Sequence, residues 1–87
     1  MTPFKLLETV VLMRDVPESG LRVGDLGAIV HLYGAEAESE PEAIDVEFVT
    51  ASGHTQAVQL LRPSDLRAVR DDDVLAVRST ASTRGAA

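Results

Sequence analysis

Residues 43–61 read AIDVEFVTASGHTQAVQLL, and this stretch decides the class of fold. Between 43 and 50, apolar and polar side chains alternate, with Ile44, Val46 and Phe48 on one side, as in a strand with one buried face. Residues 51–54 (ASGH) are typical of a tight turn, and apolar residues resume over 55–61. The stretch therefore predicts a β-hairpin with strands at 43–50 and 55–61.

Two further strands are predicted upstream of this hairpin. The run VVLM within residues 9–14 is short and rich in β-branched residues, which favours a strand over a helix. Residues 15–20, with Pro17 and Gly20, break this strand. Residues 26–33 (LGAIVHLY) form the next strand, in which Gly27 indicates a bulge or a close approach of the backbone.

The sequence after the hairpin predicts one helical turn and a last strand. Pro63, Ser64 and Asp65 suit a single turn, because proline fits its start and the other two side chains can cap free amides. Residues 67–70 follow as a short strand. We therefore predict an all-β fold, a five-stranded SH3-like barrel over residues 1–70. The prediction rests on the five short strands, the long loop after the first of them and this helical turn. The side chains expected to face inward are Val10, Leu12, Leu26, Val30, Leu32, Ile44, Val46, Phe48, Val58 and Leu60.

Three segments lie outside the predicted strands. Residues 34–42 carry four glutamates and no basic residue, so we expect a mobile loop. Residues 71–78 contain the apolar run VLAV, which either docks on the barrel as an extended segment or forms a short helix behind the aspartates. Residues 79–87 are small and polar, and we expect a flexible tail.

Composition limits the classes of function. The 87 residues give room for one domain, and the net charge of −6 is the wrong sign for binding nucleic acid. No cysteine is present, which excludes disulfides and thiolate metal sites and fits a reducing cytoplasm. No apolar run approaches the roughly 20 residues that cross a bilayer. We therefore expect a cytoplasmic protein that binds neither nucleic acid nor membrane.

The sequence predicts no catalytic residue, no metal site and no cofactor. His31 and His54 are the only histidines, and neither has a second ligand at the spacing of a metal site. The serines and threonines have no histidine base nearby in the sequence pattern. Turn and capping roles account for them, so we expect a protein that is not an enzyme.

The outer face of the predicted sheet carries the candidate site. Val11, Ile29, Tyr33 and Val49 all point outward if the inward set is correct, and His31 shares their face. Apolar side chains gathered on a surface mark interaction sites. Two alternatives remain: the long loop or residues 74–77 cover these side chains, or a partner binds them. The partner could be a second copy of the chain or a foreign protein.

Several segments resemble an uncharacterised bacterial family of small SH3-like domains. The segments are FKLLETVVL at 4–12, RDVPE at 14–18, GL at 20–21, GDLGAIV at 24–30 with Tyr33, VEFV at 46–49 with Gly53, DLRAV at 65–69 and VLAVR at 74–78. The acidic loop is longer here than the family's pattern. Residues 24–30 also resemble the KOW motif of ribosomal and transcription proteins, from which we carry over the fold and not the RNA ligand, because the basic residues are missing.

The resemblance implies a non-enzymatic protein whose relatives often lie beside toxin-like genes. It therefore suggests an antitoxin or immunity protein that binds another protein, basic or toxin-like in character. An acidic surface would speed encounter with such a partner. The alternative is an accessory or regulatory subunit that docks on an enzyme, and genomic neighbourhood distinguishes the two.

Overall fold

The computed structural model describes residues 4–34 and 40–79, which form five strands and two 3-10 turns. Residues 35–39 of the acidic loop and the tail after Ser79 lie outside the described residues, so the structure does not test what we expect of them. The predicted all-β class and the 3-10 turn before the last strand are confirmed. In chain order the elements are β1 (Thr9–Leu12), η1 (Pro17–Ser19), β2 (Leu26–Tyr33), β3 (Ala43–Val49), β4 (Thr55–Leu61), η2 (Pro63–Asp65) and β5 (Leu66–Ala68).

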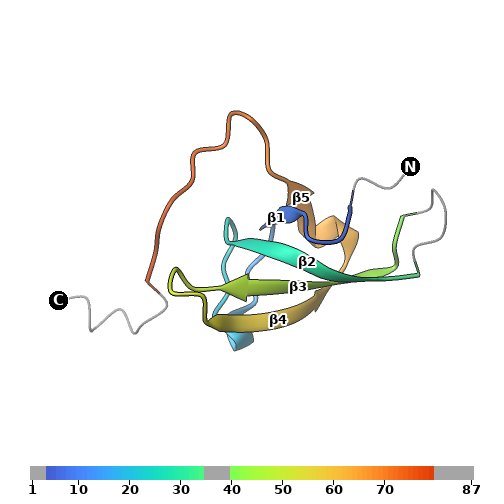
Figure 1. Ribbon diagram of the computed structural model, residues 1–87, viewed down its shortest axis with the longest axis horizontal. Helices are drawn as coiled ribbons and strands as arrows, with labels where there is room; N and C mark the ends of the chain where they lie inside the picture. Colours follow the sequence, from blue (N-terminus) through green and yellow to red (C-terminus); the bar gives the residue numbers. More distant parts are fainter. Residues whose placement is uncertain (1–3, 35–39, 80–87) are drawn as a thin grey trace.

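The strands form one antiparallel sheet in the order β4-β3-β2-β1-β5 (Figure 1). Over the described residues, the hydrogen-bonded ladder ends at β4 on one side and at β5 on the other. The sheet is therefore open, and closure into an SH3-like barrel stays a prediction. η2 connects its two edge strands, and Met13 donates a backbone hydrogen bond of 2.7 Å to the carbonyl of Asp65, which ties this turn to the end of β1.

The core lies on one face of the sheet. Five of the side chains expected to face inward are buried there, and Leu32 packs against them. Others join them from the N-terminal segment, from the loop after β1 and from the ends of β4 and β5. The buried cluster is Phe4, Val10, Leu12, Val16, Leu21, Ile29, Ile44, Val46, Phe48, Leu61 and Leu66.

A β-bulge in β2 explains part of the error in the expected inward set. Ile29 pairs with Val46, but the next pair along is His31 with Asp45, so Val30 is an additional residue. Side chains alternate along a strand, and an inserted residue reverses the face of those on one side of it. Leu32 therefore faces the core as expected, whereas Val30 and Leu26 are exposed and Ile29 is buried in their place.

The other part of the error lies in β4. Val58 pairs with Glu47 and Leu60 with Asp45, so both apolar side chains lie on the outer face and are exposed. Gln59 takes the inward position opposite Val46. The hydroxyl of Ser19 in η1 donates a hydrogen bond of 2.8 Å to the Gln59 side-chain oxygen, which satisfies this polar group beneath the sheet.

Gly27 confirms the predicted close approach of the backbone. A Cβ atom at this position would lie 2.5 Å from Cγ1 of Val46 and 2.9 Å from Cε2 of Phe48. Real side chains do not approach so closely, so β2 and β3 pack correctly only because residue 27 has no side chain. This glycine therefore leaves room on the core face of β2 for the side chains of Val46 and Phe48.

Candidate interaction surface at the C-terminal strap

The structure separates the residues expected to form one outer patch. Ile29 faces the core because of the bulge and is fully buried, so the expectation that it points outward is wrong. Val11 does lie on the outer face, opposite Leu26 and Arg67, but it is also buried. His31, Tyr33 and Val49 are exposed, as expected.

The exposed three do not form a single patch. Tyr33 pairs with Ala43 at the start of β3, whereas Val49 is the last residue of that strand, so the length of β3 lies between them. The rings of His31 and Tyr33 lie 4.3 Å apart, and the Tyr33 hydroxyl donates a hydrogen bond of 2.6 Å to Asp45. This hydrogen bond raises the pKa of Tyr33 above its ordinary value, because ionisation would place a negative charge beside the carboxylate.

The described chain continues past β5 as a segment without regular structure, residues 69–79, which we call the C-terminal strap. Figure 1 shows it leaving β5 as a wide arc and returning beside the hairpin turn between β3 and β4. Residues 71–72 form a turn, and residues 73–79 are neither helix nor strand. Val74, Leu75 and Val77 are 91%, 67% and 100% exposed, so burial of these side chains does not hold the strap, contrary to our expectation.

An ion pair fixes the start of the strap to β5. The Arg67 guanidinium donates two hydrogen bonds of 2.9 Å, one to each carboxylate oxygen of Asp73. The backbone amide of Arg70 also donates to Asp73, at 2.6 Å. These donors stabilise the charged carboxylate and lower the pKa of Asp73 to about 2.

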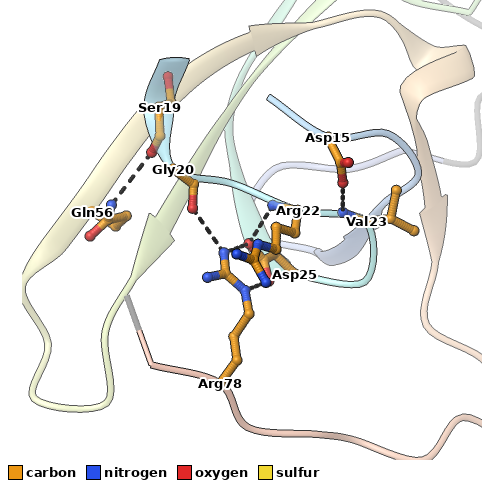
Figure 2. A network of polar contacts seen from close by, with 8 residues as sticks. All are labelled: Asp15, Ser19, Gly20, Arg22, Val23, Asp25, Gln56 and Arg78. Carbon is orange, nitrogen blue, oxygen red and sulfur yellow. Dashed lines mark hydrogen bonds and ion pairs between the residues drawn. The ribbon is translucent and has the colours of Figure 1, made fainter. Parts of the chain in front are cut away.

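A second ion pair fixes the end of the strap to the loop before β2. Arg78 donates from Nε to Oδ1 of Asp25 at 2.9 Å and from Nη2 to Oδ2. The same Nη2 donates to the Gly20 carbonyl at 2.9 Å, and the amide of Arg22 donates to Asp25 at 2.9 Å (Figure 2). Burial alone would raise the pKa of Asp25, but the Arg78 side chain and this backbone donor outweigh it, and the pKa is lowered.

A cavity of about 620 Å³ lies between the strap and the sheet. Strap residues 73–79 line one side, and the other side is mainly apolar. Val11 and Val49, which were expected to share a surface, both line this cavity. The remaining apolar side chains opposite the strap are Leu21, Leu26, Phe48 and Ala51.

The geometry of the cavity suits an apolar ligand. The two ion pairs hold the strap at both ends, while its apolar side chains remain accessible between them. An extended apolar segment could therefore contact the strap and the sheet together. No cluster of three or more His, Asp or Glu side chains within residues 4–34 and 40–79 is placed to hold a metal ion.

Sequence reasoning missed the four charged residues that position the strap. Arg67 and Asp73 are six residues apart and could have been paired only after β5 was placed. Arg78 and Asp25 are 53 residues apart, and no local pattern connects them. The available signal was the arginine at the end of the apolar run in a chain with few basic residues.

A family model described as Domain of unknown function (DUF4926) matches residues 6–68. The chain belongs to this family. The match covers all five strands and ends at the last residue of β5, so the strap lies beyond it, although residues 74–78 were part of the resemblance noted above. Comparison with curated proteins and with solved structures finds no match. Within the described residues, the chain has no helix long and apolar enough to cross a membrane.

Proposed function

We propose that this chain is a protein-binding module and that its partner binds at the strap and the cavity beneath it. One observation carries the proposal: three apolar side chains of the strap are exposed above an apolar cavity. Exposed apolar groups gathered in one place favour association, because binding removes them from water. The ion pairs at both ends of the strap reduce the conformational entropy that it would lose on binding.

The charge of the chain supports a basic partner. The net charge is −6, and Asp71 and Asp72 lie at the start of the strap with exposed side chains. Opposite charge on a partner would steer it toward this surface and raise the association rate more than the affinity. We propose more specifically that the chain binds a basic, toxin-like protein stoichiometrically in the cytoplasm and neutralises it.

Co-expression with the product of the neighbouring gene tests this function. We expect the two proteins to co-purify and the chain to restore growth of cells that express the neighbour. Replacing Val74, Leu75 and Val77 by serine should weaken co-purification strongly, whereas Val23→Ser, an exposed valine outside the cavity, should not. Normal growth when the neighbour is expressed alone would exclude the toxin, and undiminished binding by the triple variant would exclude the strap as the site.

A further inference from the structure

The two edges of the sheet differ in how they are protected from pairing with another chain. Unpaired edge strands are templates for association, and proteins usually protect them with short length or with charge. β5 is only three residues long and contains Arg67. β4 is seven residues long and has no charged side chain. It lies within residues 48–61, the longest stretch of the sequence without Asp, Glu, Lys or Arg.

The outer face of β4 is apolar at Val58 and Leu60, and among the described strands only β3 pairs with its backbone. Val58 and Leu60 are each 56% exposed. Over the described residues, β4 pairs with β3 alone, and η1 reaches it through the side chains of Gln56 and Gln59 rather than through backbone hydrogen bonds. A seven-residue edge with two exposed apolar side chains is therefore available for strand addition.

We propose that β4 is a self-association edge, which pairs antiparallel with β4 of a second copy. A two-fold axis near Gln59 would place Val58 of each copy beside Leu60 of the other, on the same face. All four exposed apolar side chains would then be cross-strand neighbours, an arrangement that stabilises paired strands. The two five-stranded sheets would become one continuous sheet of ten strands.

The net charge of −6 does not oppose a second copy at this edge, because β4 itself carries no charge. The nearest outer-face acids are Asp45 and Glu47 on β3, one strand inside the edge. Across the proposed interface, three strand spacings of about 4.8 Å would separate β3 of one copy from β3 of the other, roughly 14 Å. This separation exceeds the screening length of about 8 Å at physiological salt, so repulsion between these acids is weak. The remaining surface of the chain, which carries the acids, would repel a second copy more strongly.

Sedimentation and light scattering of the full chain measure its mean mass and so test whether β4 pairs with a second copy. Between roughly 20 µM and roughly 1 mM, the range where weak interfaces associate, the mean mass should rise toward that of a dimer. Val58→Lys or Leu60→Lys should reduce the association constant by roughly tenfold or more. Each copy would then place a lysine directly beside an apolar side chain of the other copy and diagonally across from the other lysine. Val23→Lys is the matched control, since Val23 is also 56% exposed but lies in a loop, and it should leave association unchanged.

Amide exchange gives a second readout that does not depend on a variant. Residues 57–61 should become more protected as concentration rises, because a second copy would bond their free backbone groups, whereas residues 74–77 should not change. Each lysine variant should keep the native circular dichroism spectrum, since both replaced side chains are exposed. A chain that stays monomeric throughout this range would overturn the proposal, and so would a dimer that Val58→Lys and Leu60→Lys do not weaken.

Discussion

Arg78 and Asp25 lie 53 residues apart in the sequence, yet the guanidinium of one faces the carboxylate of the other with two donors on two acceptors. Their pairing brings the end of the strap to the loop before β2. Because the apolar side chains of the strap are exposed, this ion pair and the one between Arg67 and Asp73 determine where the strap lies. The position of the proposed binding surface therefore depends on charge rather than on burial.

Replacing Arg78 by alanine should release the end of the strap while the sheet stays folded. We expect a loss of only about 0.5–1 kcal/mol in the free energy of unfolding, because the pair is partly exposed. Backbone order parameters from NMR relaxation should fall over residues 74–79. Arg70→Ala is the control, an arginine of the same strap whose side chain lies outside both ion pairs, and it should leave these order parameters unchanged. If the order parameters of residues 74–79 are the same in Arg78→Ala and Arg70→Ala, the ion pair does not position the strap.

Acid should release the strap before it unfolds the sheet. Asp73 has a pKa of about 2 and that of Asp25 is also lowered. Release of the strap would raise both values, because it separates Asp73 from Arg67 and Asp25 from Arg78. The lowered values mean that the two ion pairs stabilise the closed strap fully above about pH 4. This stabilisation decreases as the pH falls toward 2.

Chemical shifts of Val74, Leu75 and Val77, followed from pH 5 to pH 2, should report this release. The double variant Asp25→Asn and Asp73→Asn removes both titrating groups. In this double variant, the chemical shifts of the strap should not change between pH 5 and pH 2 as they do in the unmodified chain. An unchanged transition in the double variant would assign the effect to other carboxyls.

Gly27→Ala should destabilise the sheet by about 2–3 kcal/mol, measured by urea unfolding. The added Cβ would lie 2.5 Å from Val46, and overpacking of a filled core typically costs this much. Val46→Ala alone should cost about 2 kcal/mol through the cavity that it leaves. The double variant should lose less than the sum, since the shorter side chain makes room for the methyl group. Strict additivity would show that the close approach is not the cause.

Val11→Ala and Val49→Ala test the corrected outer face as a matched pair. Val11 is buried, so truncation should cost about 2 kcal/mol of stability. Val49 is exposed at the end of β3, and its truncation should change stability by less than about 0.5 kcal/mol. Similar losses in both variants would contradict the difference in burial between the two valines.

The sequence predicted the strands well where a local pattern determines them. The alternation over 43–50 identified β3, but the sequence did not reveal its register with β4, which shifts between Phe48 and Val49. The limits of β2 and β4 agree with the prediction, and the proline at 63 correctly indicated η2. These features depend on residues close together in the chain, where the period of the side chains is visible.

The errors arise where a distant residue decides the outcome. The bulge at Val30 depends on the register with β3, and a run of apolar residues such as Ala28 to Val30 gives no sign of the change of face. Gln59 faces inward opposite Val46, where the hydroxyl of Ser19, 40 residues away, donates a hydrogen bond to it. The candidate site was missed for the same reason, since ion pairs made by Asp25 and Asp73 form its framework.

The ion pair between Asp25 and Arg78 also constrains the order in which the chain folds. In an unfolded chain, closing a loop of 53 residues costs about 3.5 kcal/mol of entropy, far more than a partly exposed ion pair returns. Once β5 has joined β1 and Asp73 has paired with Arg67, only about five residues separate this anchor from Arg78, and the entropy cost of the pair is much smaller. The strap should therefore dock after the transition state for folding. Weakening it should accelerate unfolding and leave the folding rate unchanged.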